Sequence, residues 1–138
     1  MDLNEPKIAE EPKDFVRAEF SKGAYIFTEG EPGDLAYVIQ KGSVEIVKGL
    51  IDKTRLGTRS KGEVIGEMAL FDDSARIATV IALEDTVVIG ISREAFQGRL
   101  NAMDPPMRAI MENLVSRLAE LSVRMVTSKT PDNWKKRS

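Results

Sequence analysis

The chain has 138 residues, of which 42% are hydrophobic and 30% charged, and its formal net charge is −2. This length and composition indicate one globular domain with its own core, and the weak negative charge argues against binding of nucleic acid by the domain as a whole. Cysteine and histidine are both missing from the sequence. That excludes disulfides, thiolate nucleophiles, zinc–thiolate and iron–sulfur sites, His-dependent triads and His-ligated metal or haem. An enzyme would be restricted to carboxylates or lysine, so the composition favours a protein without catalytic activity.

The two ends of the chain are expected to lie outside the folded domain. Residues 1–13 are acidic, contain two prolines, and lack the basic start and apolar run of a secretory signal. Residues 127–138 are mostly polar and basic. Both are predicted to be flexible, solvated segments. The apolar stretches between them are strand-sized, too short for insertion across a bilayer, so we expect a soluble, cytoplasmic protein.

The first half of the chain has the pattern of a β-rich domain. Residues 14–20 are predicted to form a short N-terminal helix, because their apolar side chains fall near helical spacing. From residue 24 onward, short β-type runs alternate with turns rich in glycine, proline and aspartate. The runs cover residues 25–28, 35–40, 43–47, 50–56, 64–65, 77–83 and 86–91. This pattern predicts an antiparallel, jelly-roll-like β-roll of about eight strands over roughly residues 22–91.

Two C-terminal helices are predicted over roughly residues 92–126. Ser92 reads as the N-cap of the first helix, which has an acidic first turn. Asp104 precedes two prolines, which are tolerated at the start of a second, longer helix. In that helix apolar residues recur at alternating spacings of four and three, which makes a heptad seam. The seam residues, Met107, Met111, Leu114, Leu118, Leu121 and Met125, are interpreted as core or dimer contacts.

The candidate binding chemistry lies in residues 64–80. Gly66 leads into a predicted one-turn helix over Glu67–Leu70, and a loop then brings Arg76 to the start of a strand. Free amides at such a helix start can bind an anion, and the planar arginine guanidinium suits phosphate oxygens. Glu67 could accept a hydrogen bond from a sugar hydroxyl, so the segment supplies the groups that a nucleotide requires. The alternative is that Glu67 and Arg76 form a structural ion pair with each other.

This segment resembles the phosphate-binding cassette of the cyclic nucleotide-binding domain family, which runs approximately Phe-Gly-Glu-Leu-Ala-Leu, a short loop, then Pro-Arg-Ala-Ala-Thr-Val. Residues 66–70 match its first part, and residues 76–80 match its second part at the right spacing. Residues 29–34, 36–39 and 42–45 are also similar to the family, and the resemblance covers about residues 15–126. Two positions depart from the pattern. Ala75 replaces a common proline, and Ile77 replaces a small residue.

The resemblance implies that residues 14–126 form a regulatory domain that binds a cyclic nucleotide and needs no catalytic residue, metal or cofactor. Glu67 would accept the ribose 2′-hydroxyl, and Arg76 would pair with the cyclic phosphate. Backbone amides near Gly66, Ala69 and Ile77 would also bind the phosphate. The implied ligand-binding residues are Gly66, Glu67, Met68, Ala69, Arg76, Ile77 and Ala78. The long helix would be a movable lid, and Arg124 and Trp134 are further candidates for contact with the base. Ile77 lacks the hydroxyl that relatives preferring cGMP often carry after the arginine, which favours cAMP.

The candidate output of such a sensor is a homodimer through residues 105–125 or a separate effector protein. A transcription regulator of the same superfamily is an alternative, but no recognition helix is expected after the long helix, so direct contact with nucleic acid is not expected. A second alternative is a ligand-free module that dimerises through the same helix. A third is an enzyme of the cupin type, which the absence of histidine disfavours.

Overall fold

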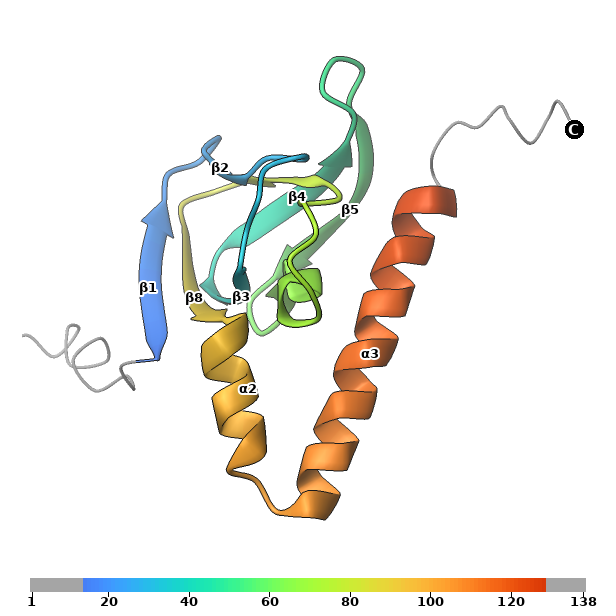
Figure 1. Ribbon diagram of the computed structural model, residues 1–138. Helices are drawn as coiled ribbons and strands as arrows, with labels where there is room; N and C mark the ends of the chain where they lie inside the picture. Colours follow the sequence, from blue (N-terminus) through green and yellow to red (C-terminus); the bar gives the residue numbers. More distant parts are fainter. Residues whose placement is uncertain (1–13, 129–138) are drawn as a thin grey trace, which may run out of the picture.

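The computed structural model describes residues 14–128, which form two four-stranded antiparallel sheets followed by two helices (Figure 1). One sheet has the order β1 (Phe15–Phe20), β8 (Thr86–Ser92), β3 (Leu35–Lys41), β6 (Val64–Ile65). The other has the order β2 (Tyr25–Phe27), β7 (Thr79–Ala82), β4 (Ser43–Lys48), β5 (Thr54–Ser60). The antiparallel roll of eight strands with C-terminal helices that the sequence predicts is therefore confirmed. Of the two predicted flexible ends, 1–13 and 127–138, the residues 1–13 and 129–138 lie outside the described residues, and residues 127 and 128 belong to the last turn of the C-terminal helix.

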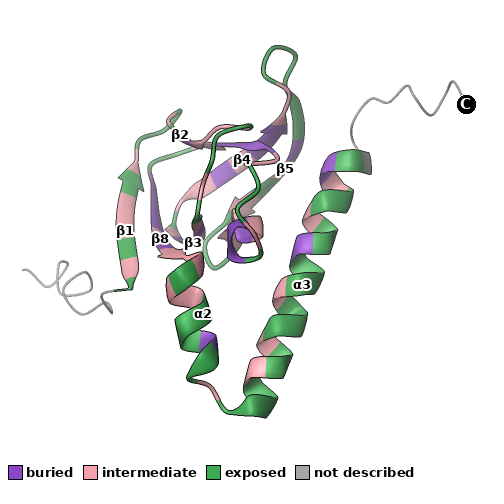
Figure 2. Ribbon diagram, viewed as in Figure 1, coloured by how far each residue is buried: buried purple, intermediate pink, exposed green. Residues whose placement is uncertain are grey.

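The core is built from buried residues of both sheets, and buried and less buried residues alternate along several strands (Figure 2). In β4, Val44 and Ile46 are buried while their neighbours Ser43 and Glu45 are partly exposed. Full burial of such an aliphatic side chain contributes about 1.5–3 kcal/mol. The buried core cluster consists of Ile26, Ile39, Val44, Ile46, Leu56, Ile65, Ala78, Val80, Val88 and Val126. Because Val126 lies near the end of the chain's last helix, this cluster also anchors that helix to the roll.

The predicted N-terminal helix is wrong, because residues 15–20 form strand β1. This strand pairs antiparallel with β8 along its whole length, from Phe15 opposite Ile91 to Phe20 opposite Thr86. Six residues are too short a segment for apolar spacing to distinguish a helix from a strand. The free edge of β8 supplies backbone hydrogen-bond partners that an isolated helical turn does not have, and this tertiary pairing overrides the local preference.

Two predicted strands are displaced. The run over residues 50–56 becomes β5 only from Thr54, because Gly49 has a left-handed φ of 98° and starts the loop between β4 and β5. Leu50 and Ile51 are exposed in that loop, which projects from the roll (Figure 1). The run over residues 77–83 is shorter in the structure, because β7 begins only at Thr79.

Both C-terminal helices begin where the sequence predicts. Ser92 caps α2 (Arg93–Asn101), and its Oγ accepts a hydrogen bond of 3.1 Å from the amide of Ala95. In α3 (Pro105–Ser128) the amide of Arg108 donates to the carbonyl of Asp104 at 2.9 Å. Between residues 14 and 128, no helix is both long enough and apolar enough to cross a membrane. The cytoplasmic location and the domain limits at 14 and 126 stay predictions.

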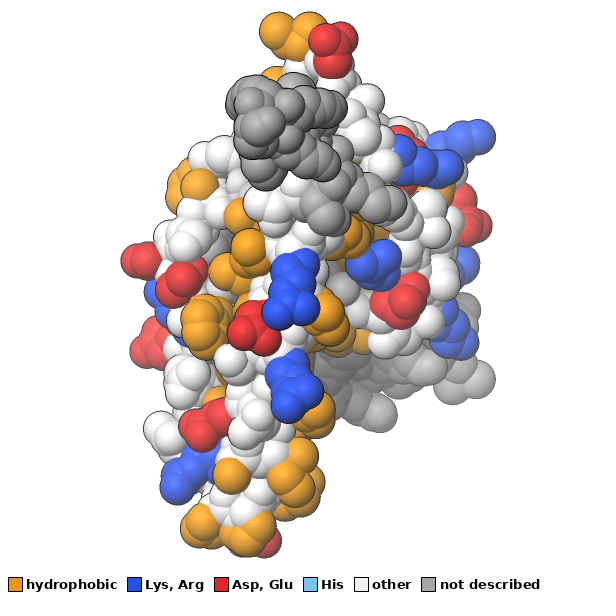
Figure 3. All heavy atoms as spheres, turned by 90° about the vertical axis from the view of Figure 1, so that its right-hand side faces the viewer, with side chains coloured by type: hydrophobic (Ala, Val, Ile, Leu, Met, Phe, Trp, Pro, Cys, Tyr) orange, Lys and Arg blue, Asp and Glu red, His pale blue; other side chains and the backbone are white. Residues whose placement is uncertain are grey.

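Most residues of the heptad seam of α3 are exposed, although Leu118 and Met125 line a cavity between α3 and the roll. Four of the seam residues are 38–58% exposed, namely Met107, Leu114, Leu118 and Leu121. The face of α3 that touches the roll is instead built on Ala119 and Val126, both buried, with Met125 packed against the core cluster. Figure 3 shows hydrophobic side chains on both sides of the charged band along this helix. The single chain therefore leaves an apolar stripe of α3 uncovered.

Candidate functional site

The residues of the predicted cassette line one cavity of about 90 Å³ between the roll and the C-terminal half of α3. The short 3₁₀ helix η1 (Glu67–Leu70) and the loop that leads to β7 form one wall, and α3 forms another. All the ligand-binding residues predicted from the cassette lie on this cavity: Gly66, Glu67, Met68, Ala69, Arg76, Ile77 and Ala78. We call residues 66–78 the cassette from here on.

Gly66 starts η1 in a left-handed conformation, with φ 73° and ψ 25°, which favours glycine. A Cβ at this position would lie 2.8 Å from Nη1 of Arg76 and 3.2 Å from Cε2 of Phe27. Both the conformation and the space therefore call for glycine. The amide of Ala69, a predicted phosphate donor, donates to the Gly66 carbonyl at 3.1 Å, so a phosphate would have to share it.

Glu67 is a buried carboxylate, with 8% of its surface exposed. One of its oxygens accepts a hydrogen bond from the hydroxyl of Ser122, which reaches it from α3. A buried carboxylate needs hydrogen-bond donors to offset its loss of hydration. In this structure a hydroxyl fills that role, which is the type of donor that a ribose also offers.

Arg76 is held so that its guanidinium lies on the cavity. Its Cζ lies 4.0 Å from the ring centroid of Phe27, and Nη2 donates to the Leu35 carbonyl at 2.9 Å. Gly33 allows this position, because a Cβ there would lie only 2.3 Å from Nε of Arg76. This Nε is buried and has no acceptor among residues 14–128. A buried, unpartnered donor on a permanent cation is suited to an anion.

The surroundings of Arg76 have opposite effects on its pKa. Burial lowers the pKa of Arg76 from its ordinary value, while nearby Tyr37, Asp34, Glu31 and Glu67 oppose that change. Arginine starts from a pKa far above neutrality, so the side chain stays cationic at neutral pH. The positive charge is therefore held partly desolvated, where it interacts strongly with an incoming anion.

Glu67 and Arg76 do not form the structural ion pair that was the alternative interpretation. The ion pairs among residues 14–128 are Arg17–Glu19, Lys48–Glu29, Arg55–Glu45 and Arg99–Asp14. Glu67 instead bonds Ser122, and Arg76 bonds a backbone carbonyl. The carboxylate and the guanidinium thus both line the cavity, and no ion pair joins them. No group of three or more acidic side chains in the described part of the chain could hold a metal ion.

Several residues of the site were not predicted from the sequence. Phe27, Gly33 and Leu35 hold Arg76, and Ser122 bonds Glu67, yet none belongs to the cassette. Arg59 of β5 also lines the cavity. Gly33 lies in the turn-rich segment 29–34 that resembles the family, which was the one available signal.

Of the two residues suggested as further contacts with the base, only Arg124 lies among the described residues. Arg124 is exposed on α3 and is not one of the described residues that line the cavity. Trp134 lies outside the described residues.

Comparison with known sequences agrees with the family resemblance of the cassette. Residues 17–102 match the family model described as "Cyclic nucleotide-binding domain". The chain is 31% identical over 120 residues to cGMP-dependent protein kinase 2 of Homo sapiens, a match that covers 84% of this chain and 16% of the kinase. It is 32% identical over 90 residues to the cAMP-dependent protein kinase regulatory subunit of Pyricularia oryzae, covering 65% of this chain and 23% of that subunit. The chain thus spans less than a quarter of the length of these relatives.

A solved structure is also similar. The EAL enzyme Bd1971 in its half-site-occupied form matches with a TM-score of 0.68 and 33% identity, over 78% of this chain and 97% of that chain. The cAMP-bound and cGMP-bound forms of the same enzyme each match with a TM-score of 0.62 and 32% identity. These matches cover 82% and 81% of this chain and 30% of each of those chains.

Proposed function

This chain belongs to the cyclic nucleotide-binding domain family, and we propose that it is a non-enzymatic sensor that binds a cyclic nucleotide, cAMP in preference to cGMP, in the cavity beneath α3. One observation carries the proposal. A buried carboxylate, Glu67, and a guanidinium with an unpartnered donor, Arg76, line the same small cavity without pairing with each other. A cyclic nucleotide offers one hydroxyl and one anionic phosphate, which complement these two groups.

The cyclic phosphate is assigned to Arg76. Arg76 lines the cavity and its Nε has no acceptor in residues 14–128, so the guanidinium has hydrogen-bonding capacity left for a phosphate. Gly66 and Ile77 lie on the same wall, so their amides can add to the site. A hydrogen bond to a charged group contributes about 1.5–3 kcal/mol, and the partial burial of Arg76 strengthens it.

The ribose is assigned to Glu67, whose carboxylate would accept the 2′-hydroxyl. The support for this assignment is the bond that Glu67 already accepts from the Ser122 hydroxyl. A ribose hydroxyl and the Ser122 hydroxyl would compete for the same buried carboxylate. Ligand binding at Glu67 therefore bears directly on the contact between α3 and the cassette.

The base is assigned to the apolar part of the cavity, to which β4, β7 and α3 contribute Ile46, Val80, Leu118 and Met125. The preference for cAMP rests on Ile77, which follows Arg76 on the cavity wall and carries no hydroxyl for a guanine. Comparing the affinities of the chain for cAMP and cGMP tests this preference.

The proposal includes movement of α3. A cavity of about 90 Å³ is smaller than the roughly 300–1,000 Å³ of sites that hold small organic ligands. The residues of α3 that line it, among them Ser122 and Val126, would have to shift for a nucleotide to enter. A ligand that binds one position of α3 better than another changes the populations of the two. The long helix is thus the element that carries the signal.

The receiver of the signal is proposed to be a second copy of this chain or a separate effector protein, at the apolar stripe of α3. The stripe is supported by the exposure of Met107, Ile110, Leu114, Leu118 and Leu121, which are 38–58% exposed. Contiguous exposed apolar side chains of this kind mark interaction surfaces more often than isolated ones do.

Calorimetric titration with cAMP and then with cGMP tests the proposal. Arg76→Ala should lose at least one charge-assisted phosphate contact, which corresponds to about 10–150-fold weaker binding. Arg55→Ala is the matched control, because Arg55 is an exposed arginine of β5 that pairs with Glu45 and does not line the cavity. Protein freed of bound nucleotide by refolding should be used.

Tighter binding of cAMP than of cGMP, lost in Arg76→Ala and kept in Arg55→Ala, would support the proposal. Tighter binding of cGMP would refute the base preference alone. Absence of heat with both nucleotides would refute the sensor and leave the ligand-free interaction module.

A further inference from the structure

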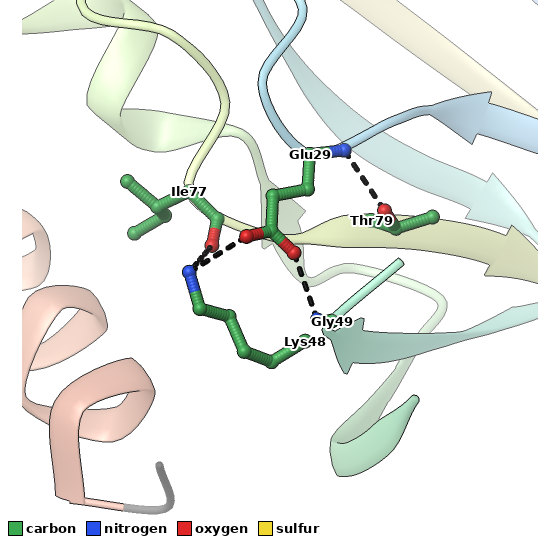
Figure 4. A network of polar contacts seen from close by, with 5 residues as sticks. All are labelled: Glu29, Lys48, Gly49, Ile77 and Thr79. Carbon is green, nitrogen blue, oxygen red and sulfur yellow. Dashed lines mark hydrogen bonds and ion pairs between the residues drawn. The ribbon is translucent and has the colours of Figure 1, made fainter. Parts of the chain in front are cut away.

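The cassette is hydrogen-bonded to a loop outside it, residues 29–31. The backbone of Arg76 forms two hydrogen bonds with this loop. Its amide donates to the Glu31 carbonyl at 2.9 Å, and its carbonyl accepts from the Gly30 amide at 2.9 Å. The amide of Glu29 donates to the Thr79 hydroxyl at 2.8 Å (Figure 4). The backbone position of Arg76 is therefore tied to residues 29–31.

The side chain of Glu29 joins this loop to the end of β4, while the Glu31 carboxylate accepts from the Thr28 amide within the loop. Oε1 of Glu29 accepts from the amide of Gly49 at 2.8 Å, and its Oε2 accepts from Nζ of Lys48 at 2.8 Å. Figure 4 shows the carboxylate lying between the end of β4 and the start of β7, pointing toward both donors. The same Nζ lies 3.4 Å from the carbonyl of Ile77 in the cassette. Glu29 and Lys48 thus join three segments that are distant in sequence.

The strand register explains why Lys48 reaches the cassette. Val47 pairs with Thr79 across β4 and β7, so Lys48 lies next to the residues that precede Thr79. Both members of the pair are partly shielded, with side chains 20% exposed for Glu29 and 30% for Lys48. Such an ion pair is less screened by solvent than one at the open surface.

The charges of the pair hold it together at neutral pH. Burial alone would raise the pKa of Glu29, but the bonds from Lys48 and Gly49 outweigh it and leave this pKa below its ordinary value. The carboxylate is therefore ionised and accepts from both donors. Neither residue lines the cavity, so neither touches a ligand there.

We propose that Glu29 and Lys48 are positioning residues of the anion site: they hold loop 29–31 and the Ile77 carbonyl in place, and so set where Arg76 and the Ile77 amide face the phosphate. This inference rests on the proposed function, because the phosphate is the group that they serve. Part of the affinity for the ligand then depends on an ion pair that lies outside the cavity.

The test compares Lys48→Met and Glu29→Gln with the unchanged chain. Both variants keep side-chain size and remove the charge attraction. Each should weaken cAMP binding by about tenfold, the size of effect typical for residues that orient a binding group from behind. The matched controls are Arg55→Met and Glu45→Gln, which break a second ion pair of the same sheet at 2.9 Å, away from the cavity. These controls should change the affinity by less than about twofold.

Two further measurements separate positioning from a general loss of stability. Amide hydrogen exchange at Gly30 and Arg76 should be faster in Lys48→Met, while exchange in β8 stays unchanged, because local opening is confined to the loop and the cassette. Lys48→Arg, which keeps a cation with several donors, should restore most of the affinity. Thermal unfolding of every variant shows whether the fold is kept.

The proposal is overturned if Lys48→Met and Glu29→Gln bind cAMP as the unchanged chain does, or if the control variants weaken binding equally. If the unchanged chain binds neither cyclic nucleotide, the proposed function is refuted by that result. The positioning role is then decided by hydrogen exchange alone, and unchanged exchange at Gly30 and Arg76 in Lys48→Met overturns it.

Discussion

Gly33→Ala is the smallest change expected to disable the site without removing a charge. Gly33 lies in the turn before β3, and its backbone is not in the left-handed region, so alanine is compatible with the chain path there. The added methyl would lie 2.3 Å from Nε, 2.5 Å from Cζ and 2.6 Å from Nη2 of Arg76. All three atoms belong to the guanidinium, so the guanidinium is what must move.

The size of the effect follows from these distances. Ordinary contacts of a Cβ begin at 3.4 Å, so the guanidinium has to shift by about 1 Å from its present 2.3 Å. The Phe27 ring at 4.0 Å and the bond to the Leu35 carbonyl at 2.9 Å then no longer hold it in the same place. Loss of a charge-assisted contact to the phosphate corresponds to about 1.5–3 kcal/mol, or roughly 10–150-fold in affinity. Folding should lose only about 1 kcal/mol, the net value of the Leu35 hydrogen bond.

Calorimetric titration of cAMP and thermal unfolding together check this prediction. The matched control is Gly98→Ala in α2, where no atom lies within 4 Å of the added Cβ and φ is not positive. Alanine in place of a helical glycine should raise the unfolding free energy by about 0.5–1 kcal/mol and leave affinity unchanged. If Gly33→Ala binds cAMP as tightly as the unchanged chain, Arg76 does not contact the phosphate from its present position, and the assignment of the anion site is wrong.

Three further predictions concern the helix, the acid stability and the apolar stripe. Ser122→Ala should strengthen cAMP binding about 2–10-fold, because it removes the hydroxyl that competes for Glu67, and unchanged affinity would argue against that competition. The pKa of Glu29 is below its ordinary value of 4.5, so its contribution to stability is present above that value and is lost as pH falls through the lower, folded-state pKa. Glu29→Gln should therefore flatten the acid limb of thermal stability, and an unchanged limb would contradict this reasoning. Leu114→Glu and Leu121→Glu should turn a dimer into a monomer in sedimentation experiments without loss of nucleotide binding, whereas a monomeric unchanged chain would leave a separate effector as the partner.

The cassette could be predicted from the sequence because its residues are close together in the chain. Gly66, Glu67 and Arg76 fall within a short segment, and a local turn, a one-turn helix and a loop are enough to bring them to one wall. The left-handed φ of Gly66 is also a local property, which only glycine adopts readily. The cap at Ser92 and the helix start at Asp104 were predictable for the same reason.

The partners of the cassette were not predictable, because they come from far along the chain. Leu35 bonds Arg76 across 41 positions, and Ser122 bonds Glu67 across 55. The pair Glu29–Lys48 spans 19 positions and acts on the cassette through a loop. No local pattern marks such contacts, since they arise only when the strands have found their register.

The sequence by itself determined most of the β-type runs, the starts of the two C-terminal helices and the candidate binding groups, because each follows from residue types and spacings within one segment. Only the tertiary structure decided that residues 15–20 pair with β8 as a strand instead of forming a helix. It also decided which face of α3 contacts the roll. As a result most of the heptad seam is exposed, and Ser122 donates a hydrogen bond to Glu67. The physical reason is the same in each case. Backbone pairing and burial are gained only against a specific neighbour, and where that neighbour lies depends on the fold of the whole domain.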